Sequence, residues 1–490
     1  MTKTILSTAL LMGLMTLPAF AQADSVRIAV ALEPPALDPT AGAAEAIDIV
    51  VYQNVFEGLT RIDQNGAVQP GLATNWTISE DGTAYTFTLA PDVRFHDGSA
   101  FDAEDVVFTF ERILGEDSRN AQKALYEVID SVEALDSHTV EITLERPTGL
   151  FLFDIGRGDA VIVAPESAEN NATVPIGTGP FAFVQWDRGS RVLLERNNDY
   201  WGEAPSLARA SFVFIGDTAT LTNALLAGEI DGTNNMASEA LPIFESNPDF
   251  QILVGTTEGE VVLATNNARP PFDDLRVRQA IAHAIDREEL IEGVTNGYSP
   301  PIYTHFAPHH PYYLDLSDIY PHDLDAARAL LAEAGHADGF RATLKLPPVA
   351  YARLSGQILA AQFADIGIRL ELINVEWAQW LEDVLTNKDY DLSIVAHVEP
   401  FDIGIYADPE YYFGYDNPDF AALIDTLNAT TNEDERRELA QQAQRILAED
   451  AVNGYLFELA QTGVWRAGLT GMWQNAPIEG VVLRDIAWSD

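Results

Sequence analysis

The chain has 490 residues, of which 75 are acidic and 28 are basic, so its formal net charge is −47. A field of that sign repels nucleic acid and anionic lipid, which argues against both as partners. The absence of cysteine excludes disulfides, thiol chemistry and a lipid attached to an N-terminal cysteine. We attribute most of the charge to adaptation to salt, which screens the repulsion, so the charge alone says little about a site.

Residues 1–23 have the order of a secretory signal peptide. Lys3 precedes an apolar run at residues 5–17, and small residues follow it, so we expect cleavage after Ala21 or Ala23. The apolar run is too short to span a bilayer. The mature chain is therefore expected to be soluble and free in a bacterial periplasm, with no lipid anchor.

The first part of the mature chain is predicted to be α+β with antiparallel strands. Residues 47–63 read as a helix leading into a strand, and residues 76–89 read as a hairpin with its turn at Asp81 and Gly82. Asp102 is expected to cap a helix over residues 99–114. The alternation at residues 138–145 indicates another strand.

From about Thr178 the pattern changes to helix–strand alternation, which is typical of an open α/β sheet. Residues 218–231 predict a helix that ends at Gly228, followed by a buried strand. Asp274 is expected to cap a further helix, and Asp286 with Glu289 forms a capping-box pattern for the next one.

A second α/β unit is predicted over roughly 270–465. Its predicted helices lie at residues 324–340 and 434–450. Its predicted strands lie at residues 341–347, 368–375 and 391–397. The remaining tail is too short to be a domain, so it must pack onto the part of the chain that folds before it.

Motifs for catalysis are mostly absent. The sequence has no phosphate-binding loop, no G-x-G-x-x-G, no G-x-S-x-G and no H-E-x-x-H. His305, His309 and His310 form a small cluster that could bind nickel, zinc or copper, but their spacing matches no strong metal motif, and a surface or structural loop is the preferred interpretation. Paired carboxylates for a glycosidase are expected by chance at this acid content.

Several segments, in order, resemble one family, the family-five extracellular solute-binding proteins, which serve peptide, nickel and opine-type ATP-driven importers. The segments are NVFEGLTRID, PGLATNWTISEDGTAYTFTLAPDVRFHDG, FDAEDVVFTFER, GTGPFAFVQWDRGSRVLLERNNDYWG, LLAGEID, PPFDDLRVRQAIAHAIDREELIEG, LDAARALLAEAG and RRELAQQAQRILAED. They extend from about Arg27 to about Leu459, which is nearly the whole mature chain.

The resemblance implies an α/β, two-lobed periplasmic-binding-protein (Venus flytrap) fold, in the large variant with an extra α+β subdomain in lobe I. Lobe I would comprise residues 24–266 plus 466–490, with the subdomain at about 44–165, and lobe II would comprise residues 267–465. The chain would cross between lobes near Asn266–Asn267 and again near Val464–Arg466.

The resemblance also implies a receptor rather than an enzyme. Two lobes joined by a hinge would close over a solute, which stabilises the closed form through contacts with both lobes. The expected partners are the ligand and an inner-membrane permease with its ATPase subunits. The protein is expected to be a monomer without cofactor or nucleic acid.

The loop at residues 397–416 is the predicted ligand site, because it combines carboxylates with aromatic rings. In peptide-binding relatives a loop at this place carries a tryptophan followed by an acid that pairs with the peptide ammonium; here Glu399 is the nearest acid and the tryptophan is missing. A buried carboxylate needs a partner such as an ammonium, and rings add cation–π contacts or apolar walls. The candidates in this loop are His397, Glu399, Asp402, Tyr406, Asp408, Tyr411 and Tyr412. The alternatives are that Asp402 and Asp408 lie in surface turns or cap helices, and that the tyrosines only pack lobe II.

Five further residues are candidates for the cleft. Glu33 follows the first strand, and α/β sheets bind ligands beyond the carboxyl ends of strands. Trp377 and Trp380 lie three apart on a predicted helix, so one of them is expected to reach the cleft unless both are in the core. Asn266 and Asn267 would bond either the ligand or the hinge backbone.

The preferred function is a receptor for a short peptide or similar amine-bearing solute. An alternative within the same fold is a receptor for a metal chelate, opine or oligosaccharide, which the missing tryptophan and the histidine cluster favour. A periplasmic hydrolase with paired carboxylates is a further alternative, and a chemosensory or chaperone-like role uses the same closure.

Overall fold

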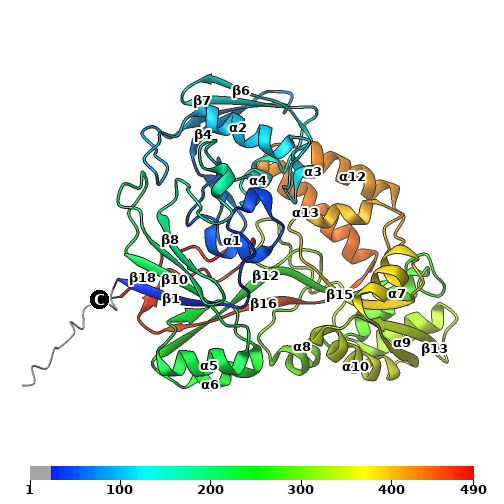
Figure 1. The fold of residues 1–490 in the computed structure, drawn as a ribbon. Helices are drawn as coiled ribbons and strands as arrows, with labels where there is room; N and C mark the ends of the chain where they lie inside the picture. Colours follow the sequence, from blue (N-terminus) through cyan, green and yellow to red (C-terminus); the bar gives the residue numbers. More distant parts are fainter. Residues whose placement is uncertain (1–23, 490) are drawn as a thin grey trace, which may run out of the picture.

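The computed structural model describes residues 24–489, and its centre is one mixed sheet of ten strands (Figure 1). In spatial order these are β14 (Ile368–Asn374), β13 (Phe340–Leu346), β15 (Leu392–His397), β12 (Phe250–Thr265), β16 (Gly454–Arg466), β11 (Gly232–Thr233), β1 (Ser25–Val30), β10 (Arg209–Phe214), β9 (Arg191–Arg196) and β8 (Phe181–Asp187).

A second sheet of four antiparallel strands belongs to a small α+β unit near the N-terminus of the chain. It comprises β4 (Ala73–Ile78), β5 (Ala84–Leu89), β7 (Thr139–Leu144) and β6 (Ile129–Asp136), and it packs on α2 (Ala103–Leu114). The predicted hairpin is confirmed as the β4–β5 pair. Asp102 caps α2 as predicted, since its carboxylate accepts from the backbone N–H of Glu104 while Asp105 bonds the Asp102 N–H.

The other strands form two short two-stranded ribbons, and the remaining helices surround both sheets. The ribbons are β2 (Thr60–Ile62) with β3 (Val68–Pro70), and β17 (Leu469–Thr470) with β18 (Ala487–Trp488). The helices are α1 (Glu45–Val51), α3 (Lys123–Tyr126), α4 (Phe151–Asp154), α5 (Thr218–Ala227), α6 (Pro242–Glu245), α7 (Leu275–Ala284), α8 (Arg287–Thr295), α9 (Leu324–Glu333), α10 (Ala350–Ala364), α11 (Trp377–Trp380), α12 (Pro418–Ala429) and α13 (Glu433–Glu449).

Both faces of the large sheet are covered, and β12 shows this by the alternation of its side chains. Val261 and Leu263 lie in one core with residues of α7 to α10, whereas Val262 and Ala264 lie in another with residues of α12 and α13. A continuous apolar run such as residues 261–264 is what a strand needs when both of its faces are buried.

Two long strands, β12 and β16, run antiparallel across the middle of the molecule and belong to both halves of the large sheet (Figure 1). The first half of β12 pairs with β16 where β16 also pairs with β11, and the second half of β12 pairs with β15. Between them the register shifts, because three residues, 257–259, lie opposite Leu459 alone. A bulge bends a strand pair, which makes residues 257–259 the natural place for a change of direction between the halves.

The C-terminal tail packs against the N-terminal part of the chain. The side chain of Asn54 donates to Val481 O at 2.8 Å and accepts from Leu483 N at 2.9 Å, and the indole of Trp488 donates to Ser25 O at 2.8 Å. The residue numbers at which the chain was expected to pass between lobes stay a prediction. No helix in residues 24–489 combines the length and apolar character needed to cross a bilayer.

Candidate functional site

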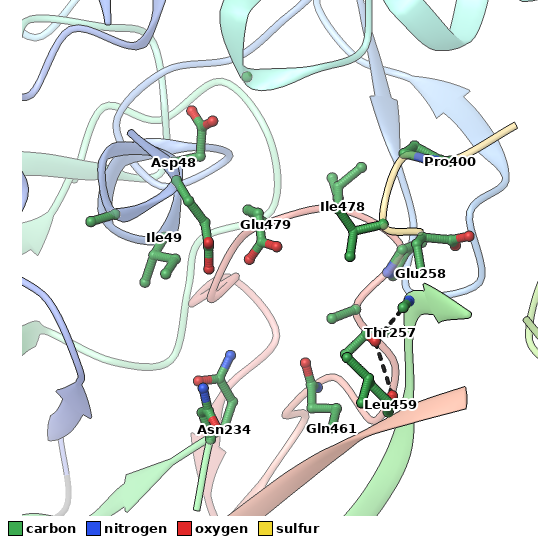
Figure 2. Close-up of a pocket in the computed structure, with 18 of the residues that line it drawn as sticks. Asp48, Ile49, Asn234, Thr257, Glu258, Pro400, Leu459, Gln461, Ile478 and Glu479 are labelled. Atoms are coloured by element: carbon green, nitrogen blue, oxygen red, sulfur yellow. Dashed lines mark hydrogen bonds between the residues drawn. The ribbon is translucent and has the colours of Figure 1, made fainter. Parts of the chain in front are cut away.

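A cavity of about 660 Å³ lies between the two halves of the large sheet (Figure 2). One side is formed by the end of β1, by α1 and by residues 234–235, and the other by residues 398–400, which follow β15. The floor is formed by the bulge at residues 257–259 and by residues 459–461 of β16. A volume of this size suits a small solute rather than a macromolecule.

The lining of the cavity is strongly acidic. Among the described residues that line it, Arg157 is the one basic side chain, and the acidic ones are Glu45, Asp48, Asp159, Glu258, Glu399 and Glu479. A cationic group entering the cavity therefore gains favourable charge interactions.

Helix α1 and the C-terminal tail bring three of these acids to one wall. Glu45 and Asp48 lie one turn apart on α1, and Figure 2 shows Glu479 of the tail facing this helix. Asp48 Oδ1 is fully enclosed and accepts no hydrogen bond. Burial, together with the charge of Asp159, raises the pKa of Asp48 to about 7.

Glu479 is open to solvent within the cavity, yet the surrounding walls restrict its hydration. This desolvation, with the neighbouring Glu45 carboxyl, raises the pKa of Glu479 to about 8. Close carboxyls of this kind hold protons or gather a cation, because two negative charges so near one another repel.

An ion pair joins the two sides of the cavity. Arg157 Nη2 lies 3.4 Å from Glu399 Oε2, and Arg157 Nε lies 3.7 Å from Asp159 Oδ1. A second contact joins the same two segments close to this ion pair: the rings of Phe153 and Phe401 meet edge to face with centroids 4.7 Å apart. Glu399 is therefore held at the cavity by a partner from the α+β unit.

Of the twelve residues proposed from the sequence, Glu399 lines the cavity, and the other eleven are not among its described lining residues. A direct role in binding stays a prediction for all twelve. Within the predicted loop, Asp402 begins a short 3-10 helix, Asp402–Ala407. This helix turns Asp402 toward two histidines instead of toward the cavity.

Asp402 is held in a buried polar network behind the bulge. His305 Nε2 bonds Asp402 Oδ1, and His397 Nδ1 lies 3.5 Å from Asp402 Oδ2. Burial alone would raise the pKa of Asp402, but the two histidines hold it well below its ordinary value. The network extends to the hydroxyls of Tyr406, 3.2 Å from His305 Nδ1, and of Tyr412, 3.0 Å from His397 Nε2.

The remaining loop candidates lie at the surface or on its border. Asp408 is exposed, and its Oδ1 accepts from the backbone N–H of Glu410 at 2.8 Å, as in a turn. Tyr411 is half-buried and packs on Tyr412 with ring centroids 5.0 Å apart.

The candidates from other segments bond to the protein itself. Glu33 Oε1 accepts from the Trp186 indole and from Gly189 N, each at 3.0 Å. The Trp380 indole is buried and donates to Ser393 Oγ at 2.9 Å, whereas Trp377 is exposed.

The side chains of Asn266 and Asn267 donate hydrogen bonds to backbone carbonyls in the half of the sheet that contains β15. Asn266 Nδ2 donates to the carbonyls of Lys388 and Tyr390, and Asn267 Nδ2 donates to carbonyls that include Val452 O. Both residues are buried.

The three clustered histidines point to different partners. His309 Nε2 lies 2.9 Å from Glu258 Oε1, and His305 bonds Asp402. His310 stacks on Phe306, and burial lowers its pKa well below the ordinary value. In residues 24–489 no group of three or more His, Cys, Asp or Glu side chains has the arrangement needed to hold a metal ion.

Sequence reasoning missed Asp48, Arg157 and Glu479. A signal for Asp48 was present, because two acids three residues apart share one face of a short helix that is otherwise apolar. No local pattern marks Arg157 or Glu479, since long-range packing brings them to the cavity.

Known proteins with similar sequences match most of this chain. The chain is 28% identical over 446 residues to heme-binding protein A of Haemophilus influenzae, covering 81% of this chain and 80% of that protein. It is 29% identical over 445 residues to di/tripeptide-binding protein 1 of Pseudomonas aeruginosa, covering 81% and 82%.

The solved structure of HbpA2 from Haemophilus parasuis has the same fold, with a TM-score of 0.89 at 24% identity, covering 95% of this chain and 100% of that one. The predicted two-lobed α/β fold class is confirmed. The model of bacterial extracellular solute-binding proteins, family 5 middle, matches residues 67–418. The chain therefore belongs to the family 5 bacterial extracellular solute-binding proteins.

Proposed function

We propose that this protein is a periplasmic receptor that binds a short peptide or similar amine-bearing solute and delivers it to an inner-membrane permease driven by ATPase subunits. The observation that carries the proposal is the acidic cavity between the two halves of the sheet. A peptide ammonium can form charge-assisted hydrogen bonds with carboxylates from both sides, and contacts with both sides are what stabilise a closed form. A relative named for di- and tripeptides supports the same class of ligand.

Glu399 is the proposed ammonium anchor. It lines the cavity, its side chain is 59% exposed, and its 3.4 Å contact with Arg157 is long enough to be replaced by a shorter bond to a ligand. Arg157 can then turn to Asp159, which lies 3.7 Å away. An exchange of partners of this kind leaves no charge without a counter-charge.

We place the hinge at the bulge of residues 257–259 and at Leu459, which faces it. Thr257 Oγ1 donates to Leu459 O at 2.9 Å and accepts from Gly259 N at 3.0 Å, so it ties the two strands at this point (Figure 2). The two lobes proposed from the sequence would move about this hinge, with the crossings at residues 257–259 and at Leu459 in place of Asn266–Asn267 and Val464–Arg466. The export signal at residues 1–23, which lie outside the described residues, belongs to the same proposal.

The receptor is proposed to act as a monomer, free in the periplasm, and without covalent chemistry. Micromolar affinity, about −8 kcal/mol, would serve uptake. The alternative functions are a receptor for a metal chelate, an opine or an oligosaccharide, and a hydrolase. The geometry of His305, which bonds Asp402, and of His309, whose Nε2 lies 2.9 Å from Glu258 Oε1, does not favour the metal alternative.

Calorimetric titration with the tripeptide Ala-Ala-Lys and with its N-acetylated form tests the proposal. We expect micromolar binding of the free peptide and at least tenfold weaker binding of the acetylated one, because acetylation removes the ammonium charge. Equal binding of both forms, or binding of neither together with binding of a sugar or opine, would reject the proposed function.

A further inference from the structure

The cavity exposes two large apolar side chains that have no counterpart to cover them. Among the large apolar residues of the part of the chain that the structure describes, Leu32 and Val398 are the most exposed, at 69% and 60%. Both line the cavity. Apolar groups exposed within a concave site, and not scattered over a convex surface, mark a place where a ligand is bound.

These two residues come from opposite halves of the large sheet. Leu32 lies two residues after β1, and Val398 directly follows β15; strands β12, β16 and β11 separate β1 from β15. A movement of the halves about residues 257–259 therefore brings them together from two sides. A group held between them would be covered by both only when the cleft closes, which is the condition for a ligand that drives closure.

The surroundings of both residues are partly apolar. Ile49, Pro400 and Ile478 also line the cavity and border the same open space in Figure 2. The acidic wall of Glu45 and Glu479 faces this space as well. The cavity thus offers apolar and anionic surface together, and a matching ligand carries an apolar group and a positive charge.

We propose that Leu32 and Val398 clamp an apolar side chain of a short peptide whose net charge is positive. This inference rests on the proposed function and adds the kind of peptide that the receptor selects. Charge complementarity favours a cationic ligand, because carboxyl residues outnumber the one arginine among the described lining residues and a nearby cation would lower the raised pKa values of Asp48 and Glu479. Peptides with an acidic side chain, and polar peptides without an apolar group, are poor ligands on this account.

The clamp would give the receptor a selectivity for apolar side chains that charge alone does not supply. Removing one buried apolar group from a ligand or from its pocket typically changes affinity by about 10-fold to 200-fold. The effect should appear only when both partners are apolar, so a clamp residue and a ligand side chain must show coupled losses.

Calorimetric titration of the full mature protein with three tripeptides tests the clamp: Leu-Leu-Lys, Ser-Ser-Lys and Leu-Leu-Glu. We expect Leu-Leu-Lys to bind about tenfold or more tightly than either of the others. Leu32→Ser and Val398→Ser should each remove most of the preference for Leu-Leu-Lys over Ser-Ser-Lys, while leaving the affinity for Ser-Ser-Lys nearly unchanged.

Leu135→Ser is the matched control, because Leu135 is 53% exposed on β6 and is not among the described residues that line the cavity. A thermal unfolding curve for each variant checks that these exposed substitutions leave the fold intact. If the three peptides bind but Leu32→Ser and Val398→Ser keep the wild-type preference, the clamp is wrong while the receptor function stands. If the wild-type protein binds none of the three, the peptide-receptor function fails and the clamp with it.

Discussion

Arg157 Nη2 lies 3.4 Å from Glu399 Oε2, and this ion pair connects two walls of the cavity across 242 positions of the sequence. Arg157 comes from the small α+β unit, and Glu399 comes from the loop after β15. A ligand ammonium that bonds Glu399 competes with Arg157 for the same carboxylate. The pair thus makes a direct prediction about binding.

Glu399→Gln should weaken binding of a cationic tripeptide by about tenfold to 100-fold, since a hydrogen bond to a charged group contributes about 1.5–3 kcal/mol. The free energy of unfolding should change by less than about 1 kcal/mol, because the Glu399 side chain is 59% exposed and Arg157 keeps Asp159 as a second partner. Titration calorimetry and urea unfolding measure the two effects.

Glu410→Gln provides the control for Glu399→Gln. Glu410 lies in the same loop, its side chain is 87% exposed and pairs with Lys388, and it is not among the described lining residues. Equal losses of affinity in the two variants would mean that general charge, and not the position of Glu399, controls binding.

Thr257→Val should destabilise the protein by about 1–2 kcal/mol, because it removes the hydrogen bond from Thr257 Oγ1 to Leu459 O, which joins β12 to β16, and the local bond from Gly259 N within the bulge. Urea unfolding provides the measurement. Thr426→Val is a suitable comparison, since the Thr426 hydroxyl bonds only within a helix, to Ala422 O, and is exposed. A loss for Thr257→Val no larger than that for Thr426→Val would contradict the role given to Thr257.

Two buried carboxyls lie directly beside the bulge, and their protonation differs between the folded and the unfolded chain. Glu260 and Glu458 are buried and lie directly opposite each other on β12 and β16, and Glu458 has no hydrogen-bond partner for its side chain. Burial, then the neighbouring carboxyls, raises the pKa of both well above the ordinary value. They therefore keep their protons in the folded state at pH values where the unfolded chain has lost them.

The sign of the pH dependence follows from this difference. The stability that these carboxyls contribute is fully present below about pH 4.5, the ordinary pKa of a glutamate, and is lost as the pH rises toward the raised folded values, at about 1.4 kcal/mol per pH unit for each proton. In Glu458→Gln the side chain keeps nearly the shape of a protonated glutamate but cannot ionise. We expect it to be more stable than the wild type at pH 8 and to gain much less at pH 5, by urea unfolding at both values.

Glu80→Gln is the control for this pH effect, because Glu80 is exposed and lies between β4 and β5. It should leave the difference between pH 5 and pH 8 unchanged. A Glu458→Gln variant with the wild-type pH dependence would show that Glu458 is already ionised in the folded protein.

The net charge of −47 predicts a dependence on salt. Raising the ionic strength from 0.01 M to 1 M shortens the screening length from about 30 Å to about 3 Å, so repulsion among the surface acids falls. Calorimetric scans should therefore show a higher unfolding temperature in 1 M sodium chloride. An unchanged or lower temperature would mean that the acids are already balanced within the fold.

Much of the fold could be predicted because local sequence patterns mark where its helices begin and end. Asp102, Asp274 and Asp286 begin helices as predicted, since a side-chain oxygen before an amphipathic run satisfies free backbone N–H groups. Gly228 ends α5 in the left-handed region, with φ of 73°, where glycine is favoured. These signals lie within a few residues of the element that they define.

The site was less predictable because its residues are assembled over long distances. The pattern of acids and rings at residues 397–416 was visible, but not the direction that each side chain takes. The 3-10 helix turns Asp402 inward to His305, whereas Glu399, before the helix, stays at the cavity. Glu479 reaches the cavity because the tail folds back on the first strand, which no local pattern indicates.

Native mass spectrometry of the protein purified from its own periplasm, with release and identification of the bound mass, tests the central claim most directly. The account predicts a mass that fits a short peptide with a net positive charge and at least one apolar side chain. A metal chelate, an opine, an oligosaccharide or an acidic peptide as the released mass would contradict it.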